Sequence, residues 1–153
     1  MSQNQHNHET CKADLIDRAE KLCSSRGTKL TNQRRIVLQR IAESHNAVGA
    51  YEIIERMASM GARPAPITIY RALDFLLDHD LVHRVESRNA YIACTCNHAT
   101  SQPILLVCAE CGLVNEVYAP SAALAVQATT TALRFTAKKI VLEVTGICAD
   151  CVA

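Results

Sequence analysis

The sequence predicts an α+β protein in which an N-terminal winged helix-turn-helix domain is followed by a small C-terminal α/β domain. Apolar residues recur at helical spacing through residues 11–79, and a short hairpin pattern follows at about 81–94. The second half contains short strand-like runs, one helix and two Cys-x-x-Cys pairs. Helices followed by a hairpin are typical of a winged helix, and the mixed second half indicates a separate α/β unit.

Each helix of the first half has a periodic apolar face and a residue that starts or stops it. Gly27 ends the first helix, Thr31 is a suitable N-cap for the second, and Pro66 is well placed to begin the last. The expected helices cover 11–26, a segment that begins at Thr31, 50–60 and about 67–79. The hairpin is expected at 81–86 and 90–94, with its turn at 87–89.

The second half predicts strands at 104–107, 113–118 and 139–145, with a helix at 120–134. A unit of about 60 residues is small for independent stability, so a bound metal and a partner copy would both help it to fold. Residues 1–10 are polar and are expected to form a disordered tail.

The composition, the apolar runs and the N-terminal pattern exclude some classes of protein. With 153 residues and 49% apolar residues the chain can bury a core, but no apolar run approaches the roughly 18 residues of a membrane span. The N-terminus lacks a secretory pattern, so we expect a cytoplasmic protein without contact with a membrane. Disulfides are rare there, and eight cysteines therefore favour metal or redox chemistry. The net charge of +1 gives no argument for nucleic-acid binding by itself.

Two Cys-x-x-Cys pairs, Cys108/Cys111 and Cys148/Cys151, supply four thiols with the spacing of one tetrahedral zinc site. Gly112 permits the tight turn that the first pair requires. Thirty-six residues separate the pairs, more than the roughly 15–20 of a simple zinc ribbon. The metal is therefore expected to join two distant segments of a larger structure.

A second group of ligand-type residues lies between the two halves. Cys94 and His98 are close enough in a polar stretch to share a metal, and Cys96 lies between them. His83 on the hairpin and Glu116 on a following strand could complete a second zinc site. On spacing alone, Cys96 is as readily a spare thiol, His83 a surface histidine and Glu116 a solvated charge.

The helix at 67–79 separates its faces. Tyr70 and Arg71 lie opposite the apolar stripe, near the N-terminal end, where a recognition helix would reach phosphates or base edges of DNA. For an isolated helix, ordinary solvent exposure explains them equally well. A zinc deaminase is disfavoured because Val107, not proline, precedes Cys108 and no His-x-Glu motif stands upstream. A thiol oxidoreductase is disfavoured because no thioredoxin-like βαβ pattern surrounds either pair.

The segments that carry a family resemblance are Thr31–Arg34, Ala50–Glu52, Thr68–Leu73, Leu81–Glu86 and the two Cys-x-x-Cys pairs. Together they resemble the ferric-uptake-regulator (Fur) family of metal-sensing repressors, and within it the zinc-uptake-regulator (Zur) branch. The resemblance covers almost everything after residue 11. It implies a DNA-binding domain at 11–88, a hinge and sensor loop at 89–100, and a dimerisation domain at 101–153.

The resemblance also implies residue roles. Cys108, Cys111, Cys148 and Cys151 would hold a structural zinc ion. His83, Cys94, His98 and Glu116 would hold a regulatory zinc ion, with Cys96 as an alternative ligand because the Cys94–His98 gap is short for this branch. Tyr51, Thr68, Tyr70 and Arg71 match positions that face DNA.

The departures from the family pattern favour zinc. The histidine- and aspartate-containing run of the iron-sensing members is replaced by the segment 94–98, and thiolates suit zinc better than hard oxygen ligands do. The expected function is therefore a non-enzymatic, zinc-responsive repressor of zinc-uptake genes. It would act as a homodimer on palindromic double-stranded DNA, with two zinc ions per chain. The alternative is a zinc-stabilised interaction module, or a thiol or zinc enzyme, that does not bind DNA.

Overall fold

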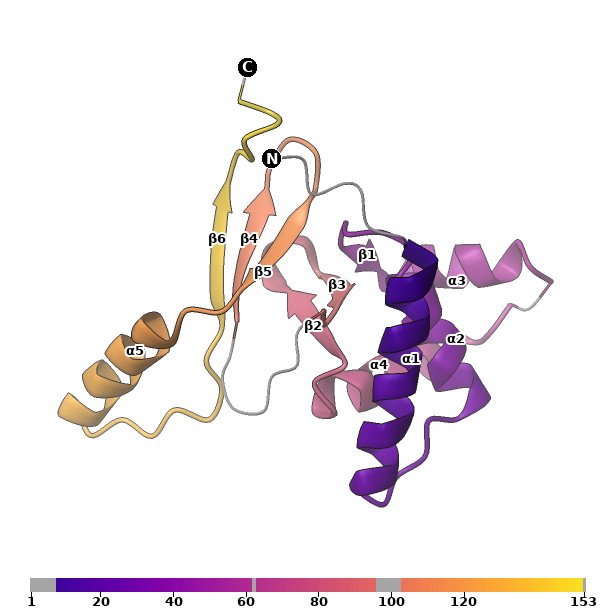
Figure 1. Cartoon of the computed structure of the whole chain (residues 1–153), viewed down its shortest axis with the longest axis horizontal. Helices are drawn as coiled ribbons and strands as arrows, with labels where there is room; N and C mark the ends of the chain where they lie inside the picture. Colours follow the sequence, from indigo (N-terminus) through magenta and orange to yellow (C-terminus); the bar gives the residue numbers. More distant parts are fainter. Residues whose placement is uncertain (1–7, 62, 96–102, 153) are drawn as a thin grey trace. The chain divides into compact units, whose positions relative to one another are not determined.

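The computed structural model describes residues 8–61, 63–95 and 103–152, with side chains from residue 12 onward (Figure 1). The chain divides into two compact units, and the division falls between Cys94 and Thr95. Each unit has its own sheet, and each is described by itself below.

The first unit contains four helices, and the sequence explains where two of them start. They are α1 (His8–Ser25), α2 (Asn32–Ile41), α3 (Ala50–Ala58) and α4 (Pro66–Asp78). Thr31 caps α2, since its hydroxyl oxygen accepts the backbone N–H of Arg34 at 3.4 Å. Pro66 is the first residue of α4, where its missing N–H costs no helical hydrogen bond. Gly27, just after α1, has a φ of +66°, which favours glycine.

A three-stranded antiparallel sheet completes the first unit as the wing. Its strands are β1 (Val48–Gly49), β2 (Val82–Val85) and β3 (Ala90–Ala93), in the order β1-β3-β2. The register pairs Val82 with Ala93 and Val85 with Ala90, and a 3-10 turn at Glu86–Arg88 joins the strands. Strand β1 is too short to leave a periodic pattern, and the sequence did not predict it.

The helices enclose one aliphatic core. Strand residues from the wing, including Val82, Tyr91 and Ala93, belong to the same cluster. On α4 the buried residues are Ile69, Ala72, Leu73 and Leu76, which confirms the predicted inner face. On α3 they are Ala50, Ile53, Ile54 and Met57. The core therefore fixes which side of α4 is turned outward.

An arginine braces the second and third helices. Arg56 on α3 donates to the carbonyl of Arg40 on α2 at 3.2 Å and to the carboxylate of Glu43 at 3.0 Å. Arg40 bonds to the other oxygen of the same carboxylate. Both arginine side chains are more than two-thirds buried, so this network is less screened than a surface pair.

The second unit is a small mixed sheet with one helix. Strands β4 (Ile104–Cys108), β5 (Val114–Val117) and β6 (Leu142–Gly146) lie in the order β5-β4-β6. β4 is antiparallel to β5 and parallel to β6, and the parallel register sets Cys108 opposite Gly146. Helix α5 (Pro120–Ala132) forms the long connection that a parallel pair requires.

Two expectations about the boundaries need correction. Helix α1 begins at His8, so residues 8–10 are helical rather than part of a disordered tail. The predicted hinge at 89–100 begins too early, because residues 90–93 form β3 and pair with both neighbouring strands of the wing. The backbone hydrogen bonds of the wing keep this segment in the first unit.

None of the helices in the described part of the chain combines the length and apolar character that a membrane span requires.

The Leu73→Ala variant should lose about 2–5 kcal/mol of unfolding free energy, because Leu73 is fully buried on α4 and its truncation leaves a cavity in the core. Urea unfolding followed by circular dichroism measures this loss. Met60→Ala is the control, since its side chain is 65% exposed and should change stability by less than about 0.5 kcal/mol. Equal effects from the two substitutions would contradict the assigned core.

Candidate metal centre and nucleic-acid interface

The two Cys-x-x-Cys pairs meet at one end of the parallel strands β4 and β6. Cys108 is the last residue of β4, and Cys148 follows β6 by two residues. The N–H of Ala109 donates to the carbonyl of Gly146 at 2.7 Å and continues the pairing beyond the strands. Parallel pairing therefore brings the distant pairs together, which explains the long gap between them in the sequence.

Tight turns direct the sulfur atoms inward. In the first turn the N–H of Gly112 donates to the carbonyl of Cys108 at 3.1 Å, and Gly112 has a φ of +77°. In the second turn the N–H groups of Cys151 and Val152 both donate to the carbonyl of Cys148, at 2.9 and 3.1 Å. The second turn needs no glycine, since none of its non-glycine residues has a positive φ.

The four sulfur atoms have the spacing of a tetrahedral metal site. All four Sγ atoms lie within 4.8 Å of one another, and those of Cys111 and Cys148 are 3.7 Å apart. A tetrahedron with Zn–S bonds of about 2.3 Å has edges of about 3.8 Å. The cysteines are free thiols. Their arrangement therefore fits Zn²⁺, which prefers four soft ligands at these distances.

The thiols differ in acidity. Backbone N–H groups of Cys111 and Cys148 point at the sulfur of Cys108 and lower the pKa of its thiol to about 6. Hydrogen bonds with the thiols of Cys148 and Cys111, and then burial, raise the pKa of Cys151 to about 12. For Cys111 the N–H of Leu113 lowers the pKa, but the thiols of Cys108 and Cys148 and burial outweigh it, so the pKa is raised overall. Four adjacent thiolates therefore require a bound cation.

The second predicted ligand group is divided between the two units. In the first unit, His83 lies on β2 and Cys94 follows β3, and a ring nitrogen of His83 lies within 4.8 Å of the Cys94 sulfur. In the second unit, a carboxylate oxygen of Glu116 on β5 accepts the N–H of Thr95 at 3.0 Å. Cys96 and His98 lie outside the described residues.

The predicted DNA-facing residues all belong to the first unit. Tyr51, in the first turn of α3, is 73% exposed, and Tyr70 and Arg71 on α4 are exposed on the side opposite the core. Thr68 is half-buried in the first turn of α4. Ile67, 59% exposed beside it, adds an apolar side chain to this face. Thr68, Tyr70 and Arg71 thus share the helix that a winged helix presents to DNA.

Two part-buried contacts were not predicted. Arg18 on α1 donates to the carbonyl of Cys94, 76 residues further along the chain. His79 is only 9% exposed, and its ring bonds to Thr28 at 2.9 Å and stacks on Phe75. No sequence pattern links such distant residues, although Arg18 precedes the buried Ala19 and is thus beside the inner face of α1.

A winged helix followed by an α/β unit with a tetracysteine metal centre defines a metal-binding protein of the winged-helix class. The model of the ferric uptake regulator family matches residues 25–145. The chain belongs to this family.

The relatives are similar over nearly the whole chain. The zinc uptake regulation protein of Escherichia coli (strain K12) is 35% identical over 147 residues, which cover 94% of this chain and 84% of that protein. A zinc uptake regulator complexed with zinc and DNA superposes with a TM-score of 0.87 at 34% identity, covering 92% of this chain and 95% of the other. Holo XcZur superposes with a TM-score of 0.80 at 35% identity, covering 95% and 98%.

Zinc uptake by the metal-free protein at pH 7 should release protons, because the raised pKa values of Cys111 and Cys151 keep both thiols protonated until the metal arrives. Zinc affinity should rise as the pH increases, by roughly tenfold per pH unit for each proton displaced. Calorimetry in two buffers of different ionisation enthalpy counts the protons. Zinc uptake without proton release would contradict the assigned protonation states.

Proposed function

We propose that this protein is a zinc-responsive, DNA-binding transcriptional regulator that represses zinc-uptake genes. The observation that carries the proposal is the four-sulfur site with zinc spacing, in a chain 35% identical to the zinc uptake regulation protein of Escherichia coli over 94% of its length. A regulator of this kind needs one ion that holds the fold and another that reports zinc supply.

The structural ion belongs to Cys108, Cys111, Cys148 and Cys151. It would link the ends of β4 and β6, so its binding free energy adds directly to the stability of the second unit. An ion with that role stays bound across the zinc concentrations at which the protein responds. It therefore cannot be the signal.

The regulatory ion is assigned to His83, Cys94, His98 and Glu116, with Cys96 as an alternative ligand. Support comes from the first unit, where the His83 ring and the Cys94 sulfur are close enough to share one metal. Since the proposed ligands come from both units, zinc would favour the relative geometry of the units that binds DNA. Linkage then requires that operator DNA tighten zinc binding by the same factor.

DNA would be read by α4 with support from α3. The exposed Tyr70 and Arg71 are suited to phosphates and base edges, and Thr68 and Tyr51 lie at the N-terminal ends of the two helices. Glu52, Glu55 and Asp74 on the same helices do not favour non-specific binding, so the contacts must be placed accurately.

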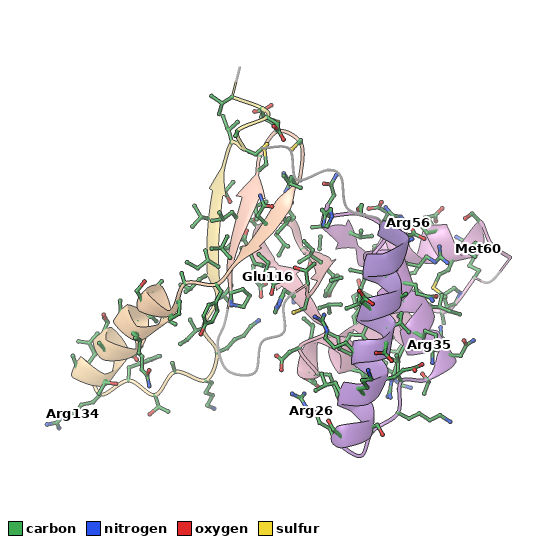
Figure 2. All side chains as sticks on the ribbon, viewed as in Figure 1. Arg26, Arg35, Arg56, Met60, Glu116 and Arg134 are labelled. Atoms are coloured by element: carbon green, nitrogen blue, oxygen red, sulfur yellow. The ribbon has the colours of Figure 1, made fainter. Side chains whose placement is uncertain are left out.

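The second unit is proposed to form the homodimer. Helix α5 has no buried residue, and Figure 2 shows its side chains, with Arg134 beyond its end, standing clear of the sheet of this unit. The exposed large apolar residues of this unit include Tyr118, Leu124, Leu133, Phe135, Val144 and Ile147. A second copy would cover such a surface. A two-fold dimer presents two recognition helices, which matches a palindromic operator.

This function places the protein in the cytoplasm, where operators and free zinc are both accessible. The family assignment favours it over an interaction module or a thiol or zinc enzyme without DNA binding.

The Cys94→Ser variant should keep its structural zinc but need at least tenfold more free zinc for DNA binding, because a hydroxyl replaces the thiolate ligand. Fluorescence anisotropy with operator DNA across a buffered zinc series, alongside zinc stoichiometry, measures both properties. The matched control is Cys23→Ser, the same change at an equally buried thiol on α1. A wild-type zinc midpoint in Cys94→Ser would remove Cys94 from the sensor.

The Arg71→Gln variant should weaken DNA binding and lower the slope of log affinity against log salt by about one, because one phosphate contact is lost. Arg134→Gln removes the same charge from the second unit and should leave both quantities unchanged. Anisotropy titrations at several salt concentrations test the pair. Unchanged binding by Arg71→Gln would favour the interaction module instead.

A further inference from the structure

Both backbone groups of Cys94 are held by hydrogen bonds within the first unit. Its N–H donates to the carbonyl of Leu81 at 3.0 Å. Its carbonyl accepts the guanidinium of Arg18, which reaches it from α1. The residue is only 2% exposed. Cys94 is therefore fixed at the end of β3, and only its side chain can adjust to a ligand.

The arginine has a clear role at this point. Strand β3 ends at Ala93, and just beyond that end Arg18 donates to the Cys94 carbonyl, a group that is costly to leave unbonded when buried. A guanidinium is always charged and binds a carbonyl without competing for metal, because it has no lone pair to offer. Its positive charge also lies beside a residue whose sulfur must be anionic to bind zinc.

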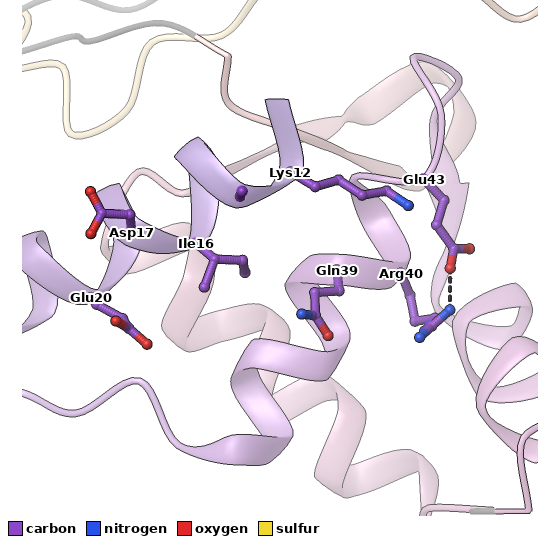
Figure 3. A pocket seen from close by; sticks show the side chains of 8 residues that line it. Lys12, Ile16, Asp17, Glu20, Gln39, Arg40 and Glu43 are labelled. Atoms are coloured by element: carbon purple, nitrogen blue, oxygen red, sulfur yellow. Dashed lines mark hydrogen bonds and ion pairs between the residues drawn. The ribbon is translucent and has the colours of Figure 1, made fainter. Parts of the chain in front are cut away.

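The surroundings of α1 indicate why the hydrogen bond between Arg18 and Cys94 matters for holding this helix. An open, charged hollow of about 580 Å³ lies between α1 and α2 (Figure 3), lined among others by Lys12, Asp17 and Arg40. Glu20 on α1 pairs with Arg35 on α2, but both side chains are at least one-third exposed, and such pairs are weak. On this side of α1 the ion pair to α2 is weak, and the Arg18 hydrogen bond to the Cys94 carbonyl adds a contact between the helix and the residue that follows β3.

We propose that Arg18 is a positioning residue of the regulatory metal site, holding Cys94 in the geometry that zinc requires and coupling α1 to metal binding. The inference rests on the proposed function, since it takes Cys94 as a zinc ligand. Residues that orient metal ligands through hydrogen bonds commonly affect metal affinity by about 10–100-fold. Zinc on Cys94 in turn holds the Arg18 contact in place and so stabilises the attachment of α1.

The test uses full-length protein without DNA, with its structural site filled by zinc, so that no step depends on operator binding. Co²⁺ is titrated into the second site, and its thiolate charge-transfer band reports ligation by Cys94. Arg18→Met, which keeps the stem and removes the donor, should weaken Co²⁺ and Zn²⁺ affinity at this site by about 10–100-fold. Arg18→Lys keeps a cationic donor and should fall between Arg18→Met and the wild type.

The control is Lys21→Met, which removes a positive charge from the same helix at a side chain that pairs with Asp17. It should change metal affinity less than twofold. The inference about Arg18 is overturned if Arg18→Met changes metal affinity no more than Lys21→Met does. The regulatory site itself still stands in that case, provided that the second metal binds to the wild type and not to Cys94→Ser. A wild-type protein that binds one metal per chain overturns the regulatory site as well. Should Arg18→Met fail to fold, Arg18→Lys alone must still show weakened affinity.

Discussion

The parallel pairing of β4 with β6 is the constraint on which the second unit depends. It joins segments separated by the whole of β5 and α5, and the four converging thiols sit where the pairing ends. Parallel strands need a long crossover, and here that crossover is α5, which packs no residue into the interior. With little apolar burial, this sheet would gain stability from a metal bound at the four thiols.

The two units reach stability by different routes. The first buries aliphatic side chains from all four helices and the wing in one cluster, which sets the outward face of α4 without any metal. The second leaves many large apolar residues exposed, and its four cysteine sulfurs converge at one site. Under the proposed function, the surface of α4 would keep a constant shape while metal binding controls whether the protein binds DNA.

Periodicity and caps in the sequence predicted the helices well, because Thr31, Pro66 and the inner stripe of α4 act locally. Spacing likewise predicted the tetracysteine site, since each pair shapes its own turn. Strand β1 and the contacts of Arg18 and His79 could not be predicted, because each depends on residues distant in the chain. The beginning of the hinge was misplaced because the hinge range overlapped the predicted hairpin strand, and residues 90–93 pair with both neighbouring strands of the wing.

The 36-residue gap between the cysteine pairs has a consequence while the chain is being synthesised. Synthesis delivers Cys108 and Cys111 first, and α5 must emerge before Cys148 and Cys151 can join them. Until then Cys108 lacks the N–H of Cys148, which helps to lower its pKa in the folded chain, and the first pair offers a metal only two of the four sulfur atoms. A structural zinc site is four-coordinate, so the site stays incomplete until the second pair is made. The nascent chain therefore passes through a stage in which its future structural anchor is still open to the wrong metal or to oxidation.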